Sequence, residues 1–129
     1  MLALDHGEAR CGCAVSDPSG TLATPLAVVE RPDTRKGLAR LGALAQELDA
    51  ELVLVGLPLT LSGDRGHQAK AAERFADQLA SRVRVPVEMY DERLTTRLAA
   101  ETGGDAQEDS RAAAHLLESW LAAKGHGDA

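Results

Sequence analysis

Carboxylates stand at three places in this chain where predicted secondary-structure elements end or begin. Asp5 closes a short apolar segment that predicts a strand, and Asp91 and Glu92 follow a second such segment. Asp109 lies in the first turns of the last predicted helix. A side chain at the carboxyl end of a strand lies at the sheet edge where open α/β sheets bind ligands. If the two strands are parallel, Asp5 and the Asp91-Glu92 pair therefore meet at one edge.

The apolar spacing of the last helix directs Asp109 toward the sheet. The stripe that we expect to be buried comprises Ala112, Ala113, Leu116, Leu117, Trp120 and Leu121. Stepping back by three or four residues puts Asp109 on the same stripe. An N-cap role is the alternative, but Asp105 and Glu108 already form the D-x-x-E pattern of a capping box. A carboxylate that faces a sheet needs a cation or a hydrogen-bond partner, which favours a metal role.

The other acids also have structural alternatives. Asp5 could be a turn aspartate before Gly7, and Asp91 could cap a helix that begins near Leu94. Asp91 and Glu92 cannot both be that cap, so one of them stays available. Carboxylates gathered at one edge repel one another when empty, and oxygen ligands of this kind suit Mg²⁺ or Mn²⁺. Two such ions could activate water and stabilise the leaving oxygen in phosphodiester hydrolysis.

Turn signals and apolar periodicity predict the elements that would position these acids. The N-terminal part predicts an antiparallel meander of strands Leu2–Asp5, Arg10–Ser16 and Thr21–Glu30. The rest predicts helix Thr34–Ala50, strand Leu52–Leu57, helix Gln68–Val83, strand Val85–Tyr90, helix Leu94–Glu101 and helix Ala106–Lys124. This order predicts one α/β domain, residues 1–124, with a mixed sheet covered by helices on both faces. We expect a flexible tail at 125–129 and a positive φ at Gly7.

The charge balance argues against a generic phosphate-binding surface. The chain has 129 residues, with 14 Lys and Arg against 20 Asp and Glu, and a net charge of −6. Its Phe, Tyr and Trp residues are one each, which is too few to stack several bases. Nucleic-acid binding would therefore depend on a local basic patch or on metal ions held by the acids. The length excludes a (β/α)₈ barrel or a two-domain kinase.

Cysteine usage and hydropathy bear on the compartment. Cys11 and Cys13 are two residues apart on a predicted strand, which is too far for a relaxed disulfide, and they lack partners for a zinc site. We expect them to be buried thiols in a reducing cytosol. No apolar run approaches the roughly 20 residues of a membrane helix. Because Met1 leads directly into a predicted strand, we expect no signal peptide, no membrane association and a cytoplasmic protein.

The chain resembles the YqgF (RuvX) family in four blocks that follow in order. Residues 4–17, LDHGEARCGCAVSD, are similar to the family's opening L-D-Y-G-x-K-R-I-G-V-A-V-S-D. Residues 55–58, VGLP, with Gly63 and Gly66, resemble its V-G-L-P segment and glycine-containing loop. Residues 91–96 match its D-E-R-L-T-T motif letter for letter. Asp109 with Ala112 and Ala113 is similar to its closing D-x-x-A-A helix.

The resemblance implies an RNase H-like fold with sheet order 3-2-1-4-5. It also implies a metal-dependent nuclease site with catalytic residues Asp5, Glu92 and Asp109, and with Asp5, Asp91, Glu92 and Asp109 as ligands of Mg²⁺ or Mn²⁺. We prefer Glu92 to Asp91 as the middle catalytic residue, since Asp91 has the capping alternative. Members of the family are described as candidate pre-16S ribosomal RNA nucleases or candidate Holliday junction resolvases. The implied cellular role is maturation of the 5′ end of 16S ribosomal RNA.

Two substitutions distinguish this chain from the family pattern. His6 replaces the family's Tyr, and Ala9 replaces its Lys, which removes one cation beside the site. The segment before Asp109 is short and acidic. A local basic rim for the substrate could still be formed by Arg10, Arg65, His67, Lys70, Arg93 and Arg97, although each of these could also be a solvated surface residue.

Three other functions are compatible with parts of this pattern. A Holliday junction resolvase acting on four-way DNA would need two sites, and therefore a symmetric homodimer. An RNA- or ribosome-associated binding factor would keep the fold without hydrolysis, and the acidic balance favours it. An actin-like or sugar-kinase-like ATP-binding hairpin would need a second domain, which this length does not provide.

Overall fold

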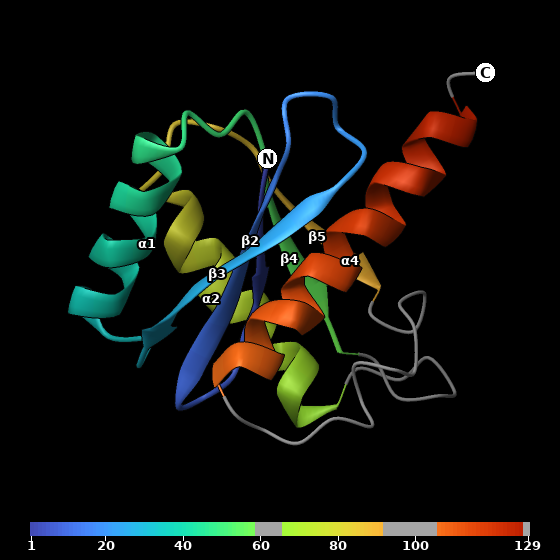
Figure 1. Ribbon diagram of the computed structural model, residues 1–129. Helices are drawn as coiled ribbons and strands as arrows, with labels where there is room; N and C mark the ends of the chain where they lie inside the picture. Colours follow the sequence, from blue (N-terminus) through green and yellow to red (C-terminus); the bar gives the residue numbers. More distant parts are fainter. Residues whose placement is uncertain (59–65, 92–105, 128–129) are drawn as a thin grey trace.

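The computed structural model of the chain describes residues 1–58, 66–91 and 106–127 (Figure 1). Its centre is a five-stranded sheet in the order β3-β2-β1-β4-β5. The strands are β1 (Leu2–Asp5), β2 (Arg10–Ser16), β3 (Ala23–Glu30), β4 (Val53–Leu57) and β5 (Val87–Asp91). β1 and β2, and β2 and β3, pair antiparallel, whereas β1 and β4, and β4 and β5, pair parallel. The predicted mixed sheet and its strand order are confirmed.

Three helices cover the sheet in the described part of the chain: α1 (Arg35–Glu47), α2 (His67–Ala80) and α4 (Ala106–Gly127). The predicted helix Leu94–Glu101 lies outside the described residues. Helix α1 begins after Thr34, whose side chain accepts a hydrogen bond from the Gly37 backbone N–H, and it ends before Asp49, which has a φ of 55°. Helix α4 continues to Gly127, so the first residues of the predicted tail are helical. Such an extension is favourable because each further residue adds one backbone hydrogen bond to an existing helix.

The β2–β3 turn explains why the third strand starts later than predicted. The Asp17 carboxylate accepts hydrogen bonds from the Ser19 hydroxyl and from the backbone N–H groups of Thr21 and Leu22, which holds residues 21 and 22 in the turn. These bonds favour the ionised form and lower the pKa of Asp17 to about 2. In the preceding turn, Gly7 does not adopt the positive φ that we expected. A Cβ there would lie 2.8 Å from the Arg10 carbonyl oxygen, so space is the reason for glycine.

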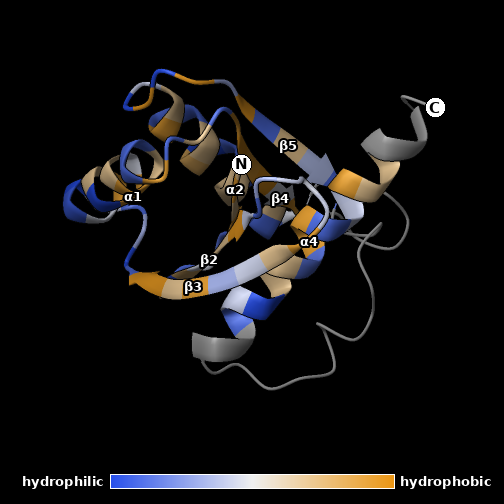
Figure 2. Cartoon of the chain, turned by 45° about the horizontal axis from the view of Figure 1, so that its top comes forward, coloured by the Kyte–Doolittle hydropathy of each residue, from blue (hydrophilic) through white to orange (hydrophobic). Residues whose placement is uncertain are grey.

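The two faces of the sheet pack against different helices. Leu2, Leu4, Val53 and Val55 face α1 and α2, which contribute Leu38, Leu41, Phe75 and Leu79 to the same cluster. The other face packs on α4 through Ala3 and Leu54 with Leu116 and Leu117, and through Ala14 with Ala113 and Ala114. Figure 2 shows mainly apolar strands, with polar residues on the side of α1 that faces away from the sheet.

The three helices in the described part of the chain all begin at the same edge of the sheet. β1, β3, β4 and β5 run in one direction and end at this edge, which lies at the bottom of Figure 1. The first residues of α1, α2 and α4 are found there as well. We call it the carboxyl edge of the sheet. No helix within the described ranges has the length and apolar character needed to cross a membrane.

Candidate active site

Gly12 of β2 lies beside both Asp5 and Asp109. Asp5, the last residue of β1, pairs directly with Gly12 of β2. A Cβ on Gly12 would lie 2.0 Å from the Asp109 carbonyl oxygen and 2.9 Å from the Ser110 backbone nitrogen. Directly paired residues of neighbouring strands point to the same face, with Cα atoms about 4.5–5.5 Å apart. The side chain of Asp5 therefore leaves the sheet on the face where the first turns of α4 contact Gly12.

A buried serine fixes this contact. Ser110 is 1% exposed, and its hydroxyl oxygen accepts a hydrogen bond from the Cys13 backbone N–H at 3.3 Å. The donor is near an irregularity in the β2–β3 ladder, where the register shifts between Cys11 and Cys13. The sequence prediction missed both Ser110 and the role of Gly12. The sequence does contain an indication of this role, because Ser110 lies three and four residues before Ala113 and Ala114 and therefore on the buried stripe of α4.

Asp109 is paired with a cation of the protein itself. Its Oδ2 atom accepts a hydrogen bond from Arg10 Nε at 2.5 Å, and both side chains are about one-third exposed. Asp109 thus lies at the border of the α4 stripe, whereas the next residue, Ser110, occupies its centre. Arg10 is therefore the cation that compensates the charge of this carboxylate. Arg10, which we predicted to bind substrate, is engaged in this pair.

Asp91 reaches the carboxyl edge on the other side of β4. Asp91 of β5 pairs with Leu57 of β4, and Leu4 of β1 pairs with Val55 of β4. Asp5 and Asp91 therefore lie at almost the same height along the sheet, two strands apart. Two strand spacings are roughly 9–10 Å. Asp91 follows Tyr90 directly in β5, however, and successive side chains of a strand point to opposite faces. The Tyr90 hydroxyl contacts Ser119 of α4. Strand alternation therefore assigns Asp91 to the face of α1 and α2, opposite to Asp5.

Of the remaining predicted site residues, His67 and Lys70 lie in the part of the chain that the structure describes. His67 and Lys70 are exposed in the first turn of α2, at the carboxyl edge. The His67 Nε2 atom lies 4.0 Å from Glu8 Oε1. Among the residues that the structure describes, no three His, Cys, Asp or Glu side chains form a group that could hold a metal. The other predicted residues lie outside the described ranges: Arg65, Glu92, Arg93 and Arg97.

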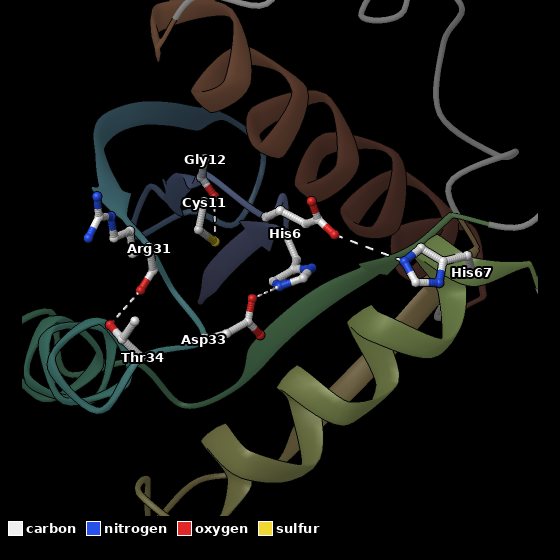
Figure 3. Close-up of polar contacts among 8 residues, drawn as sticks. His6, Cys11, Gly12, Arg31, Asp33, Thr34 and His67 are labelled. Carbon is white, nitrogen blue, oxygen red and sulfur yellow. Dashed lines mark hydrogen bonds and ion pairs between the residues drawn. The ribbon is translucent and has the colours of Figure 1, made fainter.

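A hollow of about 450 Å³ opens at this edge between β1 and α2. It is lined by Asp5, His6, Gly7, Glu8, Pro58, His67, Gln68 and Ala71. One of its walls is a histidine side chain that is only 4% exposed. His6 stacks on the buried ring of Phe75 of α2, and its Nε2 atom lies 2.8 Å from Asp33 Oδ2 (Figure 3). His6 therefore ties the residue after Asp5 to α2 and to the segment before α1.

The two thiols beside the site are structural. Cys11 and Cys13 are both free and buried, as the sequence predicted. The Cys13 thiol and burial together raise the pKa of Cys11 well above its ordinary value, so this thiol stays protonated. Cys11 and Cys13 pack in the cluster that faces α1 and α2, away from α4.

The sheet order, the helices on both faces and the acids at one edge define an RNase H-like α/β protein. Solved structures agree: Thermus thermophilus RuvC in complex with a Holliday junction substrate has a TM-score of 0.59 at 18% identity, with 97% of this chain and 96% of that chain covered. The fowlpox virus resolvase in complex with Holliday junction DNA has a TM-score of 0.53 at 11% identity, with 95% and 98% covered. These similarities establish the fold.

Sequence comparison assigns the family. The family model of RuvX, described as Holliday junction resolvase, matches residues 1–123. A candidate pre-16S rRNA nuclease of Chloroflexus aurantiacus is 41% identical over 133 residues, covering 96% of this chain and 87% of the relative. One from Mycobacterium tuberculosis is 46% identical over 130 residues, covering 93% and 76%. The chain belongs to the RuvX (YqgF) family, as the four sequence blocks indicated.

Proposed function

We propose that this protein is a metal-dependent nuclease that hydrolyses phosphodiester bonds, with Asp5, Glu92 and Asp109 as its catalytic residues. The observation that carries the proposal is the contact between Gly12 and the backbone of Asp109, because Gly12 is the strand partner of Asp5. This contact brings carboxylates from the two ends of the sequence to one face of one sheet edge. Family membership supports the same activity.

The donor chemistry fits a hard divalent cation. Aspartate and glutamate offer only oxygen ligands, which suit Mg²⁺ or Mn²⁺. Asp109 already contacts a positive charge, the guanidinium of Arg10, so this carboxylate stands where a cation can approach it. Asp91 points to the other face, and we therefore propose Glu92, the next residue in the sequence, as the middle ligand, with Asp91 in a supporting role. When bound, the ions would supply an activated water and stabilise the leaving oxygen.

The protein's own cations would bind and orient the substrate. Lys70 and His67 are exposed on the first turn of α2, and the N–H groups of that turn add positive potential at the carboxyl edge. Arg10, which pairs with Asp109 beside the site, would contact a phosphate of the substrate. We add Arg65, Arg93 and Arg97 to this set from the sequence pattern. Buried His6 would orient the chain after Asp5 through its contacts with Asp33 and Phe75.

The 5′ end of pre-16S ribosomal RNA is the substrate that we propose, with action in the cytoplasm. Relatives at 41% and 46% identity carry a pre-16S rRNA nuclease name and cover most of this chain. Four-way DNA is the second candidate, because the family model and two structural neighbours are described as Holliday junction resolvases or their complexes. A resolvase would act as a homodimer with two sites.

Cleavage assays on both substrates test this proposal. Labelled 16S precursor and a four-way junction are each incubated with Mn²⁺, Mg²⁺ or chelator. We expect metal-dependent cleavage of the precursor, and we expect Asp5→Asn to abolish it. Asp77→Asn is the matched control, because Asp77 is an exposed acid on α2 away from the site. Metal-independent binding without cleavage of either substrate would replace the nuclease with a binding factor.

A further inference from the structure

A basic surface that the proposed function does not use lies beside the site. Arg31, Arg35, Lys36 and Arg40 are all exposed at the start of α1, and they are 4 of the chain's 14 Lys and Arg residues. None of the four forms an ion pair with another residue in the described part of the chain. In a protein with a net charge of −6, this is a local concentration of unpaired positive charge.

These cations border a hollow between β3 and α1. Its volume is about 760 Å³, and it is lined by apolar Val28, Val29 and Ala39 as well as by Arg31, Lys36 and Arg40. Cations beside an apolar surface suit a nucleotide, whose phosphate is charged and whose sugar and base present apolar faces. We call this the α1 hollow.

The α1 hollow continues to the candidate active site. A neighbouring hollow of about 590 Å³ shares Glu30, Arg31 and Thr34 with it and also includes Glu8. Glu8 in turn lines the hollow that contains Asp5. Figure 3 shows this succession, with Arg31 and Thr34 on the α1 side, Asp33 and His6 in the middle, and His67 at the start of α2. A series of neighbouring hollows that share lining residues therefore leads from Asp5 to the cations of α1.

Charge varies along this surface. The middle hollow carries three acids, Glu8, Glu30 and Asp33, and it reaches Arg31 at its border with the α1 hollow; Asp33 contacts His6. Phosphate groups are repelled there and attracted at the two ends. A strand that follows the surface would have one phosphate at the catalytic acids and their metal ions, and others at Arg31, Lys36 and Arg40.

The backbone of Arg31 provides an independent indication. Its φ is 46°, in the left-handed region that favours glycine. Its carbonyl oxygen accepts hydrogen bonds from the Thr34 backbone N–H at 3.2 Å and from the Thr34 hydroxyl at 2.8 Å. A Cβ on Gly37 would lie 2.2 Å from the same oxygen, so the turn is held closely against α1. Glycine would suit this turn better than arginine, and unfavourable backbone conformations of this kind cluster at functional sites.

From these observations we propose that the surface from Asp5 to the α1 hollow binds the phosphodiester backbone of a nucleic-acid strand that extends from the cleavage site. The proposal rests on the nuclease function and adds the path of the substrate. The contacts would be to phosphate and not to bases, so RNA and DNA strands of one sequence should bind alike at the α1 hollow.

Paired charge-neutralising variants test the path. Lys36→Gln/Arg40→Gln removes two cations from the α1 hollow. Arg82→Gln/Arg84→Gln is the matched control, because it removes two exposed cations at the opposite edge of the sheet and changes the net charge equally. Fluorescent single strands of about 4 and about 16 nucleotides, lengths that span the usual range of single-strand sites, are titrated in Mn²⁺. Their backbone linkages resist hydrolysis, so that binding is measured without cleavage.

The proposal predicts a length-dependent effect. The α1 variant should bind the longer strand about tenfold more weakly than wild type, with a shallower dependence on salt, roughly 0.7 in slope for each lost phosphate contact. The shorter strand should bind the α1 variant and wild type alike. The control variant should bind both strands as wild type does.

Arg31→Gly separates binding from folding. Glycine relieves the left-handed backbone, so this variant should unfold at the same temperature as wild type or higher, yet bind the longer strand more weakly. Equal binding of the longer strand by wild type and both α1 variants would overturn the proposed path while leaving the nuclease in place. If wild type itself shows no metal-dependent cleavage, the nuclease function is refuted instead.

Discussion

The two faces of the sheet show two ways of packing a helix. Helices α1 and α2 pack on the sheet through large side chains such as Leu41 and Phe75. The first turns of α4 are held by Gly12, Ser110 and Ala113, which allow the backbone to approach β2 closely. Large residues provide area for hydrophobic burial, whereas small residues fix position. The carboxylate that the nuclease needs, Asp109, is on the closely packed face.

The largest effect on stability is expected on the face with large side chains. Leu41→Ala removes a fully buried side chain from α1 and should lower the free energy of unfolding by about 2–5 kcal/mol. The folded protein should still bind Mn²⁺ with the affinity of wild type, because Leu41 does not contact the carboxyl edge. Denaturant melts and calorimetry measure the two quantities. A loss of metal affinity as large as the loss of stability would contradict this separation of the faces.

Gly12→Ala should have a smaller effect on stability and a larger one on function. The added methyl group would lie 2.0 Å from the Asp109 carbonyl oxygen, so α4 must move away from β2. Overpacking of this kind costs about 1–3 kcal/mol. Since the movement carries Asp109 away from Asp5, we expect cleavage and Mn²⁺ binding to be lost in the folded variant. If cleavage persists at the wild-type rate, the close approach at Gly12 does not position the site.

Ser110→Ala tests the hydrogen bond that fixes α4. It leaves the buried Cys13 backbone N–H without its Ser110 acceptor, at a cost of about 1–2 kcal/mol. We expect reduced cleavage but not its loss, because the small side chain keeps the packing against β2. Ser110→Cys restores a weak acceptor and should recover part of the stability. A variant as stable as wild type would show that this hydrogen bond does not hold the helix.

The smallest effect on stability is expected for Asp109→Asn. Its ion pair with Arg10 is about one-third exposed, and such pairs contribute at most about 1 kcal/mol because of solvent screening. The variant should therefore melt slightly below wild type in chelator, yet lose metal-dependent cleavage. Arg10→Gln is the comparison, since it breaks the same pair and keeps the acid. Unchanged cleavage by Asp109→Asn would remove this residue from the site.

Local patterns predicted most of the fold, and long-range pairing explains what they missed. Continuous apolar runs and helical stripes located the described strands and helices, because burial imposes those periods. The partners of Asp109 and His6 could not be predicted in this way: Arg10 lies 99 residues from Asp109, and Asp33 lies 27 residues from His6. The expected positive φ of Gly7 was wrong, because steric space and not backbone conformation requires that glycine.

The candidate acids were predicted in part. Asp5 and Asp109 were assigned to one edge of the sheet, and the register through Gly12 agrees with that assignment. The choice between Asp91 and Glu92 was made on capping, and strand alternation beside Tyr90 assigns Asp91 to the face opposite Asp5. Glu92, Arg65, Arg93 and Arg97 lie outside the described residues, and their roles stay predictions.

A double-mutant cycle on Mn²⁺ affinity tests the central claim most directly, namely that Asp5 and Asp109 hold the same metal ions. Calorimetry would compare wild type, Asp5→Asn, Asp109→Asn and the double variant. If the two carboxylates share the ions, either single change should remove most of the affinity, and the double variant should lose little more. Additive losses from the two changes, or no Mn²⁺ binding by wild type, would contradict the account.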